Sequence, residues 1–516
     1  MAEEEKSKTV PRRLLIPQLI VACVCALGGI NCGLSTGHSA VLIPRLHQND
    51  STIPIDDDIG SWIASIYSMG MPLGNIIGGS LTDRLGRRMT LRLSQLSYIL
   101  GWILLATAQS HQMVIAARFI LGIARGMIVD TVFILMDEHS DARLRGILSL
   151  HMSLTYVIGI LIITGLGTVL EWRISTVVAT FFSIAGFLAT WVVPESPIWL
   201  VRNGKTHMAS CVLEKAWGKN QKIQARQELE TMITRCQKDG NVLFKMFLRP
   251  QVIKSFVISF ILIMLQVFCG THMFVFYSVD IISRARHGSQ DLLDEYAVTN
   301  IAGFLRIAVL IVMAWVSIGV KRRTIILSTA IVSSICLLSL GSAIAMNATS
   351  KLMSERAQSW LLLSLIFVYI ALSSIGIFTI PTILIGELLP SKIRGLACGV
   401  IYAINEVVLG SILKSYPLMW KTMGIHGMFW LFGSFCLLFA LFVFLFVPET
   451  HNHTLIQIEE YFQGHNILWQ MRPKVFRNRE SLQQQLISPQ NTPDKLERNN
   501  TVYLKLRERE LSETGC

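Results

Sequence analysis

Long apolar runs separated by short polar segments make up most of this chain. A helix needs roughly 20 predominantly apolar residues to cross the hydrocarbon core of a bilayer. We find twelve such runs, which begin near Leu14, Trp62, Leu91, Met113, Ile147, Ser175, Ile253, Val298, Ile325, Trp360, Leu396 and Met428. The pattern therefore predicts an all-α membrane protein with twelve transmembrane helices.

A repeated segment indicates that the two halves of the chain are related. Glu138 is followed seven residues later by Arg145 and then by a glycine, and Glu387 is followed in the same way by Arg394 and a glycine. Charged groups are costly near hydrocarbon, so matching charges at matching helix ends indicate that they have the same mechanical role in each half. The repeat therefore predicts two pseudo-symmetric bundles of six helices.

A second echo marks the end of each half, where a Pro-Glu pair closes an apolar run at Glu195 and again at Glu449. We therefore expect the following segments: a cytoplasmic N-terminus (1–13), a first six-helix bundle (14–200), a cytoplasmic helical loop (201–250), a second six-helix bundle (251–450) and a cytoplasmic tail (451–516), largely disordered beyond 466.

The charge distribution follows membrane topology. The formal net charge is +12, although only 16% of the 516 residues are charged and 52% are hydrophobic. Basic residues gather after spans two, four, eight and ten, and positive loops stay in the cytoplasm. Both termini are therefore expected to be cytoplasmic, and the charge indicates a lipid bilayer rather than nucleic acid as the partner.

The opposite loops carry two glycosylation sequons, at Asn49 and Asn347. Most of the ten cysteines lie inside apolar spans, so no disulfide framework is implied. The chain has no metal-ligand spacing, Walker sequence or Ser/His/Asp grouping, so we expect no cofactor or metal and no enzyme activity.

The turn after span two carries a charged motif. Two adjacent glycines are followed by Asp83 and Arg84, then by a third glycine, Arg87 and Arg88. The glycines permit close helix contact and a tight turn, and the arginines compensate an aspartate at a helix C-terminus. This G-G-x-L-x-D-R-x-G-R-R sequence resembles the loop signature of the sugar porter branch of the major facilitator superfamily.

Further motifs extend the resemblance over roughly residues 14 to 460. They are the R-F-x-x-G stretch from Arg118, the P-E-S-P-x-W-L stretch around Glu195, the G-E-x-x-P stretch around Glu387 and the P-E-T stretch around Glu449. Within the branch, the form of residues 386–395 is most similar to insect facilitated trehalose transporters. The resemblance implies the major facilitator fold, alternating access, and salt bridges that close the cytoplasmic side, formed by Asp83, Arg84, Arg87, Arg88, Glu138, Arg145, Glu195, Glu387, Arg394 and Glu449.

The expected sugar site departs from the family pattern. Span seven keeps Gln266 and the aromatic pair Phe276 and Tyr277, but His272 replaces an asparagine. Hydroxyl groups need fixed amide partners, and sugar ring faces stack on aromatic planes. The resemblance places the substrate-binding residues at Gln266, His272, Phe276, Tyr277, Asn405, Ser153 and Thr382, of which Ser153 and Thr382 differ from the usual residues. His272, Phe276 and Tyr277 could equally be packing residues.

Several charged residues lie inside predicted spans, where such residues usually line a transport pathway or a water-filled cavity. They are Arg118, Arg125, Asp130, Arg306 and Glu406. An unpaired charge at mid-bilayer is costly, so we expect Arg306 and Glu406 to compensate each other, although each could instead face water or pair elsewhere.

The leading hypothesis is facilitated uniport of a neutral sugar, trehalose or a hexose such as glucose, across the plasma membrane. Proton-coupled members carry an aspartate in span one, where this chain has Ser35, and a hydroxyl cannot carry a proton as a carboxylate does. The alternatives are a sugar sensor without appreciable flux and a carrier of a non-sugar or charged organic solute.

Overall fold

The computed structural model describes residues 12–48, 52–139, 145–217, 250–286, 294–350, 355–390 and 394–450, with isolated positions between 226 and 234 and at 462. In these residues the chain is helical and contains no strand. The first half consists of α2 (Arg12–Leu46), α3 (Asp57–Arg84), α4 (Arg87–Ala106), α5 (His111–His139), α6 (Arg145–Val169) and α7 (Trp172–Ala189).

Two short helices follow the first half, and the second half comes after them. The short helices are α8 (Pro197–Arg202) and α9 (Thr206–Trp217). The second half consists of α12 (Pro250–Phe268), α13 (Met273–Phe276), α14 (Ser278–Arg286), α15 (Glu295–Gly319), α16 (Arg322–Ser350), α17 (Glu355–Leu372), the π-helix η1 (Ser373–Thr379), α18 (Ile380–Leu388) and α19 (Arg394–Phe446).

Nine helices in the described part of the chain are long and apolar enough to cross a membrane. One of them, α19, is two helices joined at Gly424, whose φ of 68° breaks the helix. The glycine-rich α3 and the interrupted run α12–α14 bring the number of spans to twelve. The described residues therefore agree with the sequence prediction of an all-α protein with membrane-spanning helices.

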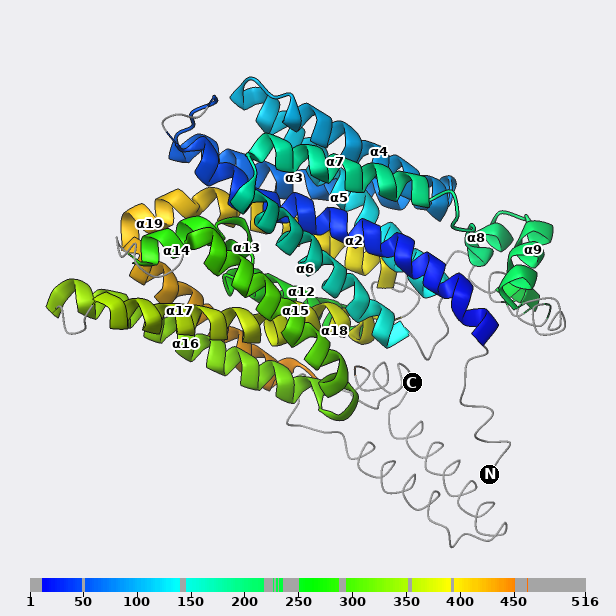
Figure 1. The fold of residues 1–516 in the computed structure, drawn as a ribbon. Coiled ribbons are helices and arrows are strands. Elements are labelled where there is room, and N and C mark those ends of the chain that lie inside the picture. Colours follow the sequence, from blue (N-terminus) through cyan, green and yellow to red (C-terminus); the bar gives the residue numbers. More distant parts are fainter. Residues whose placement is uncertain are drawn as a thin grey trace, which may run out of the picture.

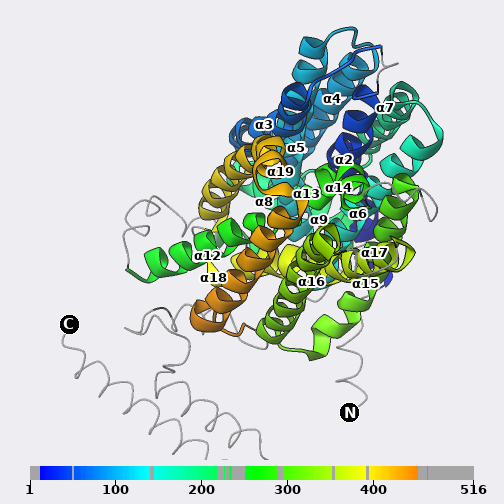
Figure 2. The same ribbon diagram turned by 90° about the vertical axis from the view of Figure 1, so that its left-hand side faces the viewer.

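The spans form two bundles that lie against each other. Helices α2 to α7 occupy the upper part of the ribbon, and α12 to α19 lie below and beside them (Figures 1 and 2). The bundles meet where α6 packs on α15 and where α3 packs on α19. Helix α2 of the first half also packs on α13 and α14 of the second half.

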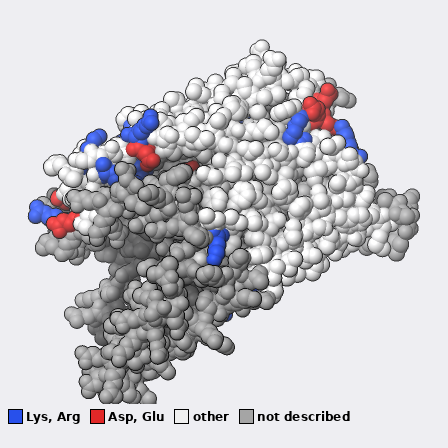
Figure 3. All heavy atoms as spheres, turned by 180° about the vertical axis from the view of Figure 1, so that it is seen from behind, with Lys and Arg blue, Asp and Glu red and all other residues white. Residues whose placement is uncertain are grey.

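The two ends of the molecule differ in character. We call the end with α8 and α9 the α8 end, and the end where α3 begins the Asp57 end (Figure 1). Charged side chains gather toward the two ends of the face in Figure 3, and the surface between them is largely uncharged, as a bilayer requires. Asn347 lies in the last turn of α16, but its side chain and Asn49 are outside the described residues.

Glycines bring α3 and α5 into backbone contact. A Cβ atom on Gly74 would lie 2.2 Å from the carbonyl oxygen of Ile123, and one on Gly126 would lie 2.2 Å from that of Met71. Helices in lipid lack a hydrophobic force between them, so such close packing supplies much of their association. By contrast, a Cβ on Gly79 would meet nothing within 4 Å.

We expect Gly74→Ala to destabilise the first bundle by about 1–3 kcal/mol, since the new methyl group must push α3 away from α5. Gly79→Ala on the same helix is the control and should leave stability unchanged. The measurement is the thermal unfolding of the purified proteins in detergent. Equal unfolding temperatures for the two variants would contradict the packing described here.

Candidate functional site

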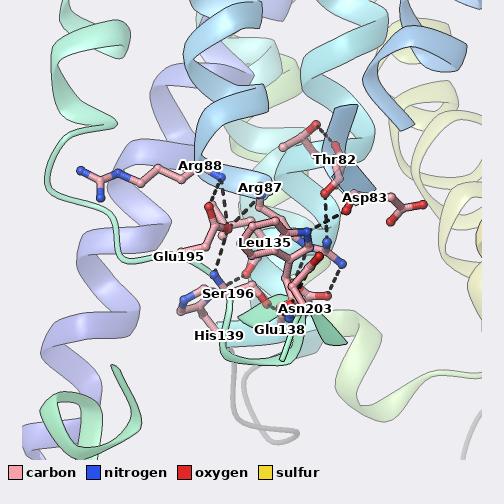
Figure 4. Close-up of polar contacts among 12 residues, drawn as sticks. Thr82, Asp83, Arg87, Arg88, Leu135, Glu138, His139, Glu195, Ser196 and Asn203 are labelled. Atoms are coloured by element: carbon pink, nitrogen blue, oxygen red, sulfur yellow. Dashed lines mark hydrogen bonds and ion pairs between the residues drawn. The ribbon is translucent and has the colours of Figure 1, made fainter. Parts of the chain in front are cut away.

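The α8 end of the first half is held together by a charged network (Figure 4). Arg87 is 3% exposed and donates from Nε and Nη2 to the two oxygens of Glu138, at 2.9 and 2.8 Å. Glu195 accepts from the backbone nitrogens of Arg87 at 2.9 Å and Arg88 at 3.3 Å. These nitrogens begin α4, and a carboxylate is favourable at a helix N-terminus. The network therefore ties α4 to α5 and to the segment before α8.

The second half repeats this network with different spacing in the sequence. Arg322 forms an ion pair with Glu387. Glu449 accepts from the backbone nitrogens of Arg322 at 3.1 Å and Arg323 at 3.2 Å, which begin α16. Arg322 thus occupies the role of Arg87, which the sequence analysis did not assign to it. The run of three basic residues at 321–323, after span eight, is the sequence feature that could have indicated this role.

The ion pairs described at the α8 end all lie within one half or the other. Asp83 and Arg84 are exposed, and the described residues offer their side chains no ion pair. Arg88 donates to the carbonyl oxygen of Trp191 at 2.8 Å. The side chains of Arg145 and Arg394 are outside the described residues, so their role in closing this end stays a prediction.

The Asp57 end, by contrast, has ion pairs that join the two halves. The Nζ atom of Lys414 lies 2.6 Å from Asp58, and that of Lys421 lies 2.7 Å from Asp57. Both lysines belong to α19 and both aspartates to α3. We call these two pairs the Asp57 latch.

A layer of aromatic side chains lies beneath the latch. Tyr277 stacks on Tyr416 with 4.1 Å between ring centroids, and Tyr416 donates to Asp280 at 2.6 Å. Phe276 contacts Tyr67 of the first half at 6.0 Å between centroids. Phe276 and Tyr277 are buried here, so the structure places them in the closed layer where the halves touch.

The middle of the molecule contains a polar and aromatic cluster that both halves build. Tyr156 of α6 stacks on Phe378 of η1 with centroids 5.8 Å apart, and His272 contacts Phe378 edge-on at 5.6 Å. Gln266 donates to the carbonyl oxygen of Phe378 at 3.1 Å. Arg125 lies over the Tyr156 ring at 5.4 Å. We call these five residues the central cluster.

Backbone irregularities position the central cluster. Gly270, with φ at 83°, separates α12 from α13 and places His272 at the break. The π-helix η1 carries Phe378, and π-helices are rare and often lie at functional sites. Broken helices near mid-membrane are typical of transporter binding sites. Tyr156 and Phe378 were not predicted, because aromatic residues in apolar spans carry no mark that separates stacking from packing.

The remaining predicted binding residues differ in burial. Asn405 is 6% exposed, and its Oδ1 atom accepts no hydrogen bond from the part of the chain that the structure describes. Ser153 is partly buried, and Thr382 is exposed and donates to the carbonyl oxygen of Thr379 at 2.6 Å. Among the described residues, no polar contact links Ser153 or Thr382 to the central cluster, so their part in binding stays a prediction.

Arg118 is fully buried, and none of the described carboxylates pairs with it. It donates to the carbonyl oxygens of Ser35 at 2.6 Å and Ile63 at 3.3 Å and to the hydroxyl of Ser39, and it lies 4.5 Å from the Tyr67 ring. The hydroxyl of Ser35 is itself bonded to Tyr67 at 2.6 Å. Carbonyl oxygens and the π face of the Tyr67 ring therefore stabilise the Arg118 guanidinium in place of a carboxylate.

The intramembrane charges do not pair as the sequence analysis expected. Glu406 interacts electrostatically with Arg125 of the other half, not with Arg306. Arg306 has the phenols of Tyr156 and Tyr369 as its electrostatic neighbours. Asp130 is partly buried and lies within electrostatic range of Tyr402. In the described residues, no group of three His, Cys, Asp or Glu could hold a metal ion.

A family model described as "Sugar (and other) transporter" matches residues 21–462. The chain belongs to this family. It is therefore a membrane transporter of the sugar porter type and not an enzyme.

Similar proteins include the facilitated trehalose transporters Tret1 of Apis mellifera ligustica and Bombyx mori. They are 28% and 27% identical over 87% of this chain and 88% of each relative. Tret1-1 of Drosophila simulans is 30% identical over 87% of this chain and 52% of its own length. The chain thus spans most of the first two relatives and about half of the third.

Solved structures share the fold. The proton:xylose symporter XylE bound to 6-bromo-6-deoxy-D-glucose superimposes with a TM-score of 0.69 at 21% identity, over 86% of this chain and 99% of that one. An inward-open form of XylE from E. coli gives a TM-score of 0.68 over the same shares. At this identity the likeness concerns the fold alone.

We expect the double variant Asp57→Asn, Asp58→Asn to open the Asp57 end more often. Exposed ion pairs contribute up to about 1 kcal/mol in total here, which is roughly a fivefold shift between two states. The readout is labelling of a Ser65→Cys reporter by a membrane-impermeant thiol reagent, because Ser65 is buried where α3 packs on α19.

Asp56 provides the matched control for the Asp57 latch. It is an exposed neighbouring aspartate, and the described residues give its side chain no ion pair. Asp56→Asn should leave the labelling rate unchanged. Equal labelling in the double variant and the control would mean that the latch does not bias the conformational equilibrium.

Proposed function

We propose that this protein moves a sugar across the plasma membrane by facilitated diffusion and alternating access. The observation that carries the proposal is the asymmetry of its ion pairs. Pairs between the halves occur at the Asp57 end, whereas the described pairs at the α8 end stay within each half. The central cluster lies between these ends, where rocking of two rigid halves would expose it to one side at a time.

The similarity to facilitated trehalose transporters favours trehalose or a hexose such as glucose as the solute. The central cluster has features that suit a sugar: Gln266 offers a carboxamide, and Tyr156 and Phe378 offer ring faces. Asn405, which the sequence analysis assigned to the binding site, has a buried carbonyl oxygen that accepts no hydrogen bond from the described residues. Such acceptors suit the hydroxyl groups of a carbohydrate.

The α8 end is proposed to face the cytoplasm, together with both termini. Basic residues follow the spans that end there, which is the arrangement of cytoplasmic loops. The Asp57 end, closed by the latch and the aromatic layer beneath it, then faces outside. In this orientation the structure corresponds to a state closed to the exterior.

A charged organic solute is the second candidate. Arg306 is 7% exposed, and its Nε atom donates to none of the described residues. A guanidinium without a counter-ion is unusual inside a neutral-sugar site, since buried charges are ordinarily paired.

Uptake of labelled trehalose and glucose by cells that express the protein tests the proposed function. We expect saturable uptake that equalises the solute across the membrane and does not exceed the outside concentration. Surface display, measured with an epitope tag, is the control. A protein that is displayed, binds sugar and gives no uptake would be a sensor, and the transport proposal would fail.

We expect transport to be independent of a proton gradient, since Ser35 cannot bind and release a proton as a carboxylate does and Arg118 is already satisfied by carbonyl oxygens. The measurement is sugar accumulation in proteoliposomes with an imposed pH gradient, with and without a protonophore. Uphill accumulation that the protonophore abolishes would show coupling, in which case Asp130 and Glu406 are the carboxylates to replace first.

A further inference from the structure

Two buried arginines converge on the central cluster from opposite halves. Arg125 lies on α5 and Arg306 on α15, and both act electrostatically on His272 and on the phenol of Tyr156. Both guanidinium groups therefore lie within electrostatic range of the same two side chains of the central cluster.

The protein leaves this pair of cations only partly compensated. Arg125 donates to the hydroxyl of Thr36 at 2.7 Å and interacts with the carboxylate of Glu406. None of the described residues forms an ion pair or hydrogen bond with Arg306, although its side chain is 7% exposed. Glu406 is the carboxylate of the described residues that acts on Arg125, and none of them acts on Arg306, so these residues do not fully neutralise the two guanidinium groups.

A surplus charge away from water is unfavourable unless an opposite charge or donor-acceptor partner arrives. The planar guanidinium of Arg306 presents parallel N–H donors that match a carboxylate in a two-point contact. A carboxylate on the solute would satisfy the unpaired Nε atom and balance the charge.

The rest of the region remains suited to hydroxyl groups. Gln266 uses its amide nitrogen on Phe378, which leaves its carbonyl oxygen to accept, and the buried Oδ1 of Asn405 has no partner. Glu406 also has one buried oxygen, Oε2, without a hydrogen bond. The acceptor oxygen of Gln266 at the central cluster and the unpaired guanidinium of Arg306 together fit a solute that carries hydroxyl groups and one acidic group.

We propose that the site recognises sugar acids, meaning polyhydroxylated monocarboxylates such as aldonates or uronates, with Arg306 as the residue that binds the carboxylate. The inference rests on the proposed sugar transport and assigns its preferred solute class. It implies that Arg306 sets the choice between acidic and neutral sugars.

The first experiment measures binding to the purified full-length protein by thermal shift. Gluconate, glucuronate, glucose and trehalose are the probes, with sodium chloride to match ionic strength. We expect the sugar acids to raise the unfolding temperature more than the neutral sugars. This additional increase in unfolding temperature should disappear in Arg306→Gln. It should return in part in Arg306→Lys, because lysine restores the positive charge but not the planar guanidinium group.

Arg173→Gln is the matched control. Arg173 lies on α7 at the Asp57 end and donates to the carbonyl oxygen of Ala106 at 3.0 Å, away from the central cluster. Its loss removes one arginine from the protein without changing the binding region. It should keep the wild-type preference for sugar acids, whereas an equal loss in both variants would attribute the effect to net charge and overturn the role of Arg306.

The second experiment measures uptake into proteoliposomes under an imposed membrane potential. Uniport of an anion moves charge, so an inside-positive potential should accelerate gluconate uptake, and we expect Arg306→Gln to reduce that uptake by about tenfold or more. Glucose uptake in the variant should stay the same or rise.

The outcomes separate the inference from the proposed function. Uptake of neutral sugars without competition from gluconate or glucuronate would overturn the inference and leave sugar transport standing. Binding of sugar acids that depends on Arg306, without any uptake, would support the recognition of the carboxylate and refute transport. Binding of none of the four probes would overturn both.

Discussion

Every charged group inside a bilayer must find a partner, because water is not there to solvate it. This constraint arranges the structure from its ends to its centre. At the α8 end, Arg87 is neutralised by Glu138 in a two-point contact. Deeper in the first half, Arg118 relies on carbonyl oxygens and a phenol ring. At the centre, Arg306 has the phenols of Tyr156 and Tyr369 nearby but no ion pair or hydrogen bond with the described residues, and we propose that the solute supplies its partner.

The same constraint explains why the halves can move as units. The carboxylates Glu195 and Glu449 each cap the helix that begins just after a tight turn, so each half is braced by its own charges. Glycine contacts such as Gly74 against α5 add rigid backbone packing within the first half. Pairs between the halves, by contrast, lie at the water-exposed Asp57 end, where an ion pair is weak enough to break during a transport cycle.

The sequence predicted much of this fold because its signals are local. Apolar runs mark the spans, and the repeated Glu-to-Arg step marks the related halves. The partners within the fold were harder to foresee. Arg322 was not matched to Arg87, because the distance from the arginine to its glutamates differs between the halves. Glu406 interacts with Arg125 across the interface, and no pattern in one chain reveals which of two distant helices will face it.

The central cluster shows a second limit of sequence reasoning. Gln266 could be expected from its motif, but Tyr156 and Phe378 gain their position from a π-helix and from contact between halves, neither of which leaves a local pattern. His272 lies in the cluster because Gly270 breaks the span. Irregular backbone thus positions the residues of the central cluster, whereas the regular apolar pattern determines the membrane-spanning helices.

The break in α19 at Gly424 has a mechanical consequence. Lys421 lies only three residues before this glycine, so the Asp57 latch and the turn into the last span share one short stretch of backbone. A long connecting loop would allow Lys421 to move without displacing the helix that follows. Here no such loop separates them, so a displacement of Lys421 when its ion pair with Asp57 breaks would also move the start of the final membrane-spanning helix.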